Sequence, residues 1–216
     1  DGELGYQYTA PRLSLGVNLY YMKYKDQLVP TGMVNDDSNA LNTNVPDSYR
    51  RGVELSASWR ATGWFTVGAN ATFSQNRIEN YVDALKDSPT YGKELGDMTI
   101  AYSPDVIANA FLNFHHRGFE AVFHTQHVGK QYFTNNENDA LSLDAYCVTN
   151  LNLAYTFRTR SARSVRLGLL INNLFNAEYE SNGYGYSYMD TWSGPAPVRI
   201  DEAYYFPQAP LNVLAN

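Results

Sequence analysis

The stretch Ser164–Tyr179, SVRLGLLINNLFNAEY, decides the fold class, because the other long elements of the chain repeat the pattern of its first half. Alternate side chains of an extended strand point to opposite faces. Four apolar residues therefore share one face of this segment: Val165, Leu167, Leu169 and Ile171. The other face carries mostly small or polar residues, and the asparagines that follow suit a strand end. The stretch predicts a long β-strand with one apolar and one polar face.

The composition of the whole chain favours strands over helices. The 216 residues are 44% hydrophobic with a mean hydropathy of -0.41, and no window approaches the roughly 18 uninterrupted apolar residues of a membrane helix. Aromatic residues make up 14% of the chain, including 18 tyrosines, and tyrosine favours strands. We therefore expect an all-β protein without a spanning helix.

Charge and reactive residues exclude several classes of function. The net charge of -6 and the pI near 5.1 argue against a nucleic-acid partner, because no basic stripe is present to neutralise phosphates. The single cysteine, Cys147, has no partner for an internal disulfide and is expected to be a small strand residue. The pairs His115/His116 and His124/His127 would point to opposite faces of a strand, so neither forms a metal site. We expect no enzymatic activity, no cofactor and no metal.

Acidic loop residues offer one alternative, because calcium takes oxygen ligands. The candidates are Asp36, Asp37 and Asn39 in one loop and Glu137 and Asp139 in another. A solvated loop is the preferred interpretation of both groups.

Alternating patterns predict about eight long strands. They fall at residues 3–8, 12–24, 49–60, 65–74, 106–114, 119–133, 146–157 and 165–172, with a further strand starting at 204. The register of the 106–133 hairpin is the least defined, because Ile107, Phe111 and Val122 are out of phase with the neighbouring apolar residues. A strand of 13 residues, such as 12–24, would be roughly 40 Å long.

The connections between these strands alternate in length. Short ones lie at residues 9–11, 61–63, 115–118 and 158–163, and long polar ones at 26–48, 77–104, 134–144 and 177–203. This alternation is typical of an outer-membrane β-barrel, whose long loops lie outside the cell and whose apolar face contacts lipid. Aromatic residues near both strand ends, as in Trp64 with Phe73 or Tyr146 with Tyr155, suit two interfacial girdles. A soluble β-sandwich or lectin-like domain is the alternative, but soluble strands average about five to six residues.

Four short motifs support a family resemblance. They are Tyr24–Leu28 (YKDQL), Arg51–Leu55 (RGVEL), Val128–Tyr132 (VGKQY) and Asn172–Asn176 (NNLFN), the last followed by Tyr179. In this order and spacing the chain resembles the C-terminal barrel portion of the TonB-dependent outer-membrane receptors of Gram-negative bacteria. The resemblance implies a barrel of about 22 strands with a plugged lumen. Residues 1–216 would then form roughly its last third, as a fragment without the plug domain and the earlier strands.

The resemblance also implies a function and partners. Such receptors import a scarce nutrient, an iron chelate, haem, cobalamin or a glycan, with energy that the TonB complex delivers through the N-terminal plug. The expected partners are outer-membrane lipid, the plug and the nutrient. By resemblance, Glu54 is expected to contact plug arginines from the lumen side. A passive porin and a surface adhesin or glycan-binding β-protein remain the alternatives.

The loop at residues 177–203 is the candidate ligand-binding segment. Exposed aromatic side chains are costly to display without a use, and they supply a large contact area with few rotatable bonds. Four of them are expected to contact the ligand: Tyr184, Tyr186, Tyr188 and Trp192. Tyr179, close to the strand end, is expected instead to continue the outer aromatic girdle or to pack the loop on itself.

Overall fold

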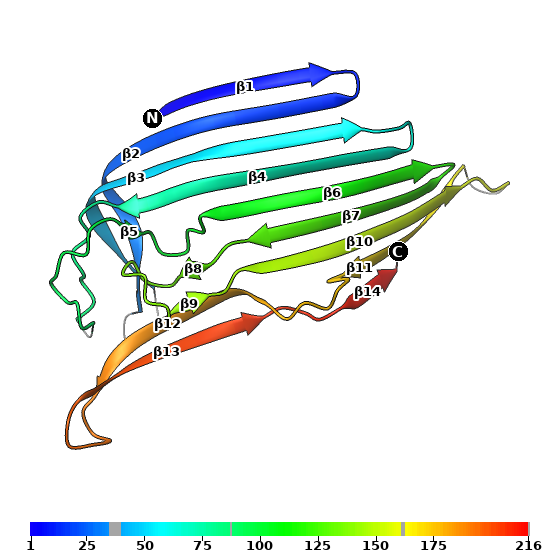
Figure 1. Cartoon of the computed structure of the whole chain (residues 1–216). Coiled ribbons are helices and arrows are strands. Elements are labelled where there is room, and N and C mark those ends of the chain that lie inside the picture. The colour runs from blue at the N-terminus through cyan, green and yellow to red at the C-terminus, as the bar shows by residue number, and fades with distance from the viewer. Residues whose placement is uncertain (35–39, 87, 161–162, 216) are drawn as a thin grey trace.

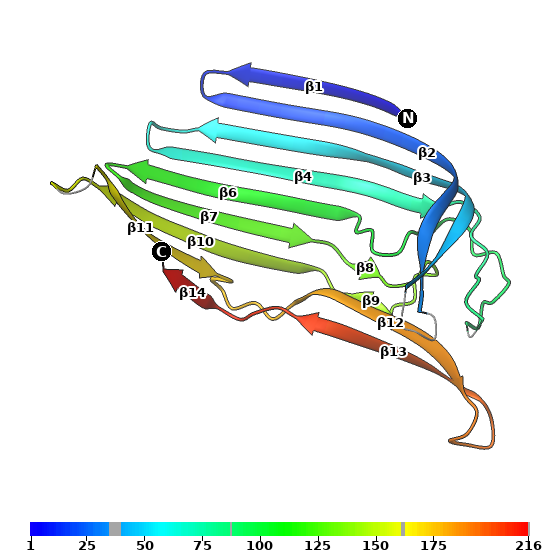
Figure 2. The same ribbon diagram turned by 180° about the vertical axis from the view of Figure 1, so that it is seen from behind.

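The protein is an open, curved antiparallel sheet in a computed structural model that describes residues 1–34, 40–86, 88–160 and 163–215 (Figures 1 and 2). Its strands are β1 Gly2–Ala10, β2 Leu13–Val34, β3 Ala40–Arg60, β4 Phe65–Ile78, β5 Met98–Thr99, β6 Val106–His116, β7 Phe119–Val128, β8 Gln131–Tyr132, β9 Ser142–Leu143, β10 Tyr146–Phe157, β11 Val165–Asn172, β12 Glu180–Asp190, β13 Val198–Pro207 and β14 Asn212–Ala215. Among these described residues, no helix has the length and apolar character needed to cross a membrane.

The main sheet follows the chain order. Its strands lie in the sequence β1-β2-β3-β4-β6-β7-β10-β11-β14, and β5 pairs with the end of β4. Figure 1 places the short connections at one end of the sheet and the long ones at the other. β1 and β14 lie at opposite edges, so the barrel is not closed. The predicted all-β fold and the alternation of short and long connections are confirmed, although two of the four long connections are paired strands and not loops.

The β6–β7 turn is tighter than the sequence predicted. His115 and His116 belong to β6, and only Arg117 and Gly118 connect the strands, with φ of 48° and 85°. Positive φ at both positions matches the two-residue turns that follow the twist of a hairpin. A Cβ at Gly118 would lie 2.3 Å from the Thr156 carbonyl oxygen, so glycine is needed for space as well.

The register of this hairpin explains the residues that were out of phase. Phe111 pairs with Gly68 and therefore lies on the polar face of the sheet, opposite Leu112. A Cβ on Gly68 would meet the Phe111 ring at 2.3 Å, so the ring covers the glycine. Aromatic rings often cover glycines in this way on sheets. Phe111 and Ile107 are apolar residues on the polar face, which is why simple alternation failed here.

The apolar face of the sheet is exposed along its length. Leu19 is 46% exposed and Leu55 is 43% exposed, although both lie in strands that pair with a neighbour on each side. A soluble sandwich would bury such a face against a core. Outward-facing apolar side chains are the arrangement of a membrane barrel.

Aromatic residues gather at both ends of the strands, with one correction to the predicted girdles. Trp64, Phe65 and Phe114 stack near the short turns, while Tyr21 stacks on Tyr49 near the long connections. Tyr155 stacks on Phe157 at the short-turn end.

Tyr146 does not belong to the same surface as Tyr155. Residues nine apart in a regular strand point to opposite faces. Tyr146 pairs with Val128 on the polar face and packs against Tyr179, with ring centroids 4.7 Å apart. Tyr179 therefore packs against a strand residue on the polar face, and not in the outer girdle or within its own connection as predicted.

The predicted loop at residues 26–48 is wrong, because β2 and β3 continue through most of it and pair as far as Val34 and Ala40. These outer strand parts are polar, so they lack the alternation of the membrane part. They are held by a small core of buried residues: Val29, Val45, Ile78, Tyr81 and Ile100. The segment at 77–104 is largely the irregular connection that was predicted, apart from β5.

The predicted loop at residues 177–203 is also wrong. It forms most of a separate two-stranded hairpin, β12–β13, which pairs from Glu180↔Pro207 to Asp190↔Val198. The strand expected from 204 onward is divided between the end of β13 and β14, which pairs with β11. Within 134–144, a short β9 pairs with β8.

Candidate ligand-binding surface

One face of the β12–β13 hairpin carries a continuous row of aromatic rings. Tyr188 stacks on Trp192 with ring centroids 6.5 Å apart, and Tyr186 lies 6.2 Å from Tyr188. The row continues through Tyr204 to Tyr184, whose ring centroids are 5.1 Å apart. Phe206 ends it, 6.1 Å from Tyr184. The structure therefore brings together all four predicted site residues and adds Tyr204 and Phe206; we call this surface the aromatic face.

Glu202 lies within the aromatic face and accepts three hydrogen bonds. Its carboxylate oxygens accept the hydroxyls of Tyr186 at 3.0 Å, Tyr188 at 3.0 Å and Tyr204 at 2.7 Å. The bonds from Tyr204, Tyr186 and Tyr188 hold the pKa of the Glu202 carboxyl below its usual value. Glu202 is therefore ionised at neutral pH.

Two phenols of this cluster, Tyr204 and Tyr188, have raised pKa values. Contact with the Tyr186 hydroxyl and the bond to Glu202 raise the pKa of the Tyr204 phenol. The bond to Glu202 also raises the pKa of the Tyr188 phenol. Because the three hydroxyl hydrogens point at Glu202, these phenol oxygens are left with only lone pairs to offer a ligand.

The glycines between the tyrosines allow the hairpin to dock. Gly183 and Gly185 face away from the aromatic face, toward the fully buried Phe133. A Cβ on Gly183 would lie 2.8 Å from the Phe133 ring, and one on Gly185 would lie 2.8 Å from a Leu141 methyl group. The Gly-Tyr repeat thus packs one face closely and displays the other. It belongs to a paired hairpin and not to the loop predicted for residues 177–203.

The hairpin rests on residues 133–143, which are themselves tied to the rest of the sheet. Phe133, Leu141 and Leu143 form a buried cluster against Ala203, and the Tyr205 hydroxyl donates to the Ser142 carbonyl at 3.1 Å. These contacts set the position of the aromatic face.

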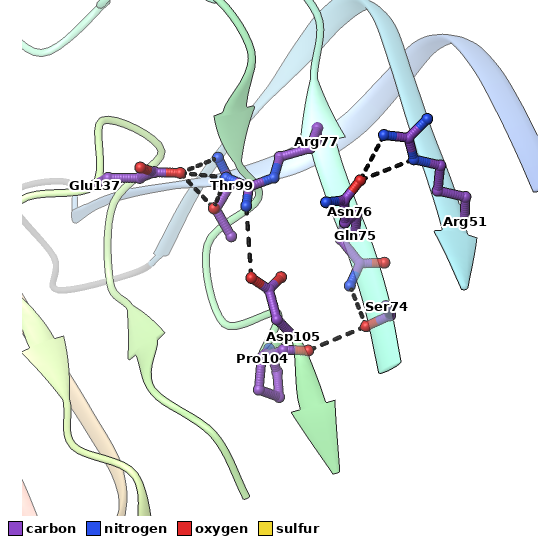
Figure 3. Close-up of polar contacts among 9 residues, drawn as sticks. All are labelled: Arg51, Ser74, Gln75, Asn76, Arg77, Thr99, Pro104, Asp105 and Glu137. Carbon is purple, nitrogen blue, oxygen red and sulfur yellow. Dashed lines mark hydrogen bonds and ion pairs between the residues drawn. The ribbon is translucent and has the colours of Figure 1, made fainter. Parts of the chain in front are cut away.

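Polar contacts of residues 135–137 complete the support. The Asn135 amide donates to the Pro30 carbonyl at 2.7 Å and accepts from the Ala101 amide at 2.8 Å. Glu137 binds Arg77 and the backbone amide of Thr99, as Figure 3 shows. We call residues 133–143 the hub segment, because it joins β2, β4 and the hairpin.

A second candidate region lies on the polar face of the main sheet. Glu54 accepts a hydrogen bond from the Asn18 amide at 3.2 Å and pairs across the sheet with Thr72. A hollow of about 660 Å³ opens beside it, lined by polar groups of Gln7 and Asn70 among others. Among the described residues, no lysine or arginine forms an ion pair with Glu54. The expected alternation, with Glu54 opposite Val53 and Leu55, is present.

The candidate metal residues form no cluster in the part of the chain that the structure describes. His124 pairs with Phe111 and His127 with Ala108, on opposite faces of the sheet. Glu137 is bound to Arg77, and Asp139 to Lys130. Asp36, Asp37 and Asn39 lie outside the described residues. Cys147 is a free, exposed thiol.

Sequence reasoning missed Glu202 and the hub segment. Alternation over Ile200, Glu202, Tyr204 and Phe206 was a usable signal, because it continues the period of the tyrosines in β12. The hub segment gave no such signal, since its role depends on single polar side chains that reach distant elements.

The exposed apolar face, the long strands and the short and long connections define this chain as part of an outer-membrane β-barrel. A family model described as "TonB dependent receptor-like, beta-barrel" matches residues 2–174. The chain belongs to this family.

Solved structures share the fold over almost the whole chain. The ferric-catecholate import receptor Fiu of E. coli K12 is 18% identical with a TM-score of 0.64, and the match covers 99% of this chain and 26% of that one. The ferric citrate transporter FecA is 15% identical with a TM-score of 0.65, covering 99% of this chain and 29% of that one. The copper transporter OprC is 20% identical with a TM-score of 0.61, covering 94% and 29%. This chain thus spans less than a third of the length of each of these proteins.

Proposed function

We propose that the chain is the C-terminal part of a TonB-dependent receptor that imports a scarce nutrient across the outer membrane of a Gram-negative bacterium. The observation that carries the proposal is the family match over residues 2–174. In the complete receptor, the polar face would line the lumen, and a plug domain outside this chain would close it and receive energy from the TonB complex. The protein would act as a receptor and not as an enzyme.

The aromatic face is the proposed contact surface for the nutrient. It belongs to the long-connection end of the sheet, which lies outside the cell in barrels of this type. Trp192 is 77% exposed and Tyr184 is 41% exposed, so both rings can meet a ligand. The hub segment holds the hairpin in place, which lowers the entropy lost on binding.

The class of nutrient needs separate evidence, since fold does not determine substrate. The titles of the similar structures name ferric catecholate, ferric citrate and copper. An iron complex is therefore one candidate, beside haem, cobalamin and glycans.

Growth on limiting nutrients tests the proposed transport. A strain lacking the parent gene is supplied with one source at a time, as a ferric chelate, haem, cobalamin or an oligosaccharide. We expect growth to fail on one source, to return with the parent gene, and not to return in a strain that also lacks TonB. Growth that returns without TonB would identify a passive porin and contradict the proposal.

A further inference from the structure

The aromatic face combines rings with negative charge on a surface that has no positive charge of its own. Of the residues of β12 and β13 that alternate onto this face, Glu202 and Asp190 are acidic, and none is lysine or arginine. Arg199 lies on the opposite face and pairs with Asp201 at 2.7 Å. The face is therefore electronegative.

Hydrogen bonding within the cluster reinforces this polarity. Glu202 accepts hydrogen bonds from the hydroxyls of Tyr186, Tyr188 and Tyr204. The oxygens of these four side chains can therefore only accept hydrogen bonds from a ligand. The flanking rings of Tyr184 and Trp192 add the negative potential of aromatic faces, which attracts organic cations. An anionic ligand would be repelled by the Glu202 carboxylate and would find no free hydroxyl hydrogen on Tyr186, Tyr188 or Tyr204.

We propose that the aromatic face binds an organic cation, so that the ligand reaches this surface through an ammonium or guanidinium group. This inference rests on the proposed role of the hairpin as the ligand-contact surface, and it specifies the charge of the group that is recognised there. A hard metal ion fits less well, because Glu202 is the single carboxylate among Tyr186, Tyr188 and Tyr204 and both of its oxygens already accept their hydroxyls.

Choline and 3,3-dimethyl-1-butanol, its uncharged carbon analogue, provide a matched pair of probes. Both are titrated into the purified full-length receptor, and binding is measured by saturation-transfer NMR and calorimetry. We expect choline to bind at least about tenfold more tightly than the analogue, as a cation between rings and a carboxylate should. Equal affinities, or no saturable binding of choline, would overturn the proposal.

Substitutions locate the binding to this surface. Glu202→Gln should reduce choline affinity to that of the analogue, because it removes the carboxylate that accepts the three tyrosine hydroxyls. Met189→Leu, on the opposite face of the hairpin, should leave choline affinity unchanged. Asp190→Asn provides a second test that keeps an acceptor for the backbone amides of Trp192 and Ser193, and it should cause a smaller loss. Unchanged choline binding in both acidic variants would contradict the assignment.

The outcome is separable from that of the proposed function. Loss of the preference for choline would leave TonB-dependent growth intact and would remove only the cation specificity. TonB-independent growth with choline preference intact would remove the transport proposal and retain the cation site.

Discussion

Two proposed roles depend on single residues of this chain: a plug contact made by Glu54 on the polar face, and docking of the hairpin through the glycines of its Gly-Tyr repeat. Glu54 has an amide neighbour in Asn18 but no ion-pair partner among the described residues. A carboxylate inside a plugged lumen is costly without a cation. This is consistent with a partner supplied by the plug domain.

Glu54→Gln should loosen the plug in the full-length receptor. Removing one member of a desolvated charge pair costs about 2–5 kcal/mol, so the plug should become more sensitive to protease and uptake should change. Limited proteolysis and transport assays measure both effects. Ser56→Ala, on the same face two residues away, is the matched control. If plug protection and uptake stay the same, Glu54 has no role in plug contact.

Gly185→Ala should weaken the docking of the hairpin. The added Cβ would approach both the Glu202 carbonyl oxygen and a Leu141 methyl group to 2.8 Å. Overpacking of this kind costs about 1–3 kcal/mol, so hydrogen exchange of residues 180–207 should become faster. Gly194→Ala, with open space around its Cβ, should have no effect. Equal hydrogen-exchange rates of residues 180–207 in the two variants would mean that close packing at Gly185 does not hold the hairpin in place.

At the scale of elements, the membrane part of the sheet was predictable and the outer part was not. Apolar and polar residues alternate along a membrane strand because one of its faces contacts lipid. The segment Val165–Ile171 shows this alternation, so its strand could be predicted from the sequence. Outside the membrane both faces of a strand meet water or protein, so β2 and β3 continue through polar residues. Val29 and Val45 are the buried hydrophobic residues in the described part of these outer segments. Those two valines resemble isolated loop residues in the sequence.

Only part of the candidate site could be predicted from the sequence. The tyrosines of β12 and Trp192 could be predicted because they are exposed aromatic residue types close together in the sequence. Glu202 lies on the partner strand β13, and the hub segment lies in a different connection, so neither is close to the tyrosines in the sequence. Their proximity depends on pairing and on buried amides such as Asn135, which leave no periodic pattern.

The connection between β4 and β5 should loosen at low pH. Asp83 is fully buried, and although burial opposes its charge, hydrogen bonds from Ser88, Thr90, Leu85 and Asn136 hold the pKa of its carboxyl below the usual value. A lowered folded-state pKa stabilises the structure above the unfolded value near 3.9, and this stabilisation is lost as pH falls through the folded value.

Hydrogen exchange of residues 79–97 in the full-length receptor measures this effect. Protection should be constant from about pH 8 to 5 and should fall at pH values below about 4, after correction for the intrinsic exchange rate. Asp83→Asn should lower protection at neutral pH and flatten the profile. If the protection of residues 79–97 still falls at low pH in the Asp83→Asn variant, the loss of protection must come from another carboxyl group.

On the scale of the whole molecule, the buried clusters lie at the long-connection end and the exposed apolar surface lies between the ends. Val29, Ile78 and Ile100 belong to one cluster, and Phe133 and Leu141 to the other. This distribution separates a membrane-spanning sheet from a folded outer part that carries the aromatic face. The account therefore depends on the long connections lying outside the cell.

Labelling of single cysteines on intact cells tests this orientation most directly. In a full-length receptor with Cys147→Ser, the variants Gly194→Cys and Gly63→Cys place a thiol at the hairpin tip and in the short β3–β4 turn, two positions with open space for a side chain. An impermeant maleimide should label the first on whole cells and the second only after the outer membrane is permeabilised. Labelling of Gly63→Cys but not Gly194→Cys on whole cells would contradict the account.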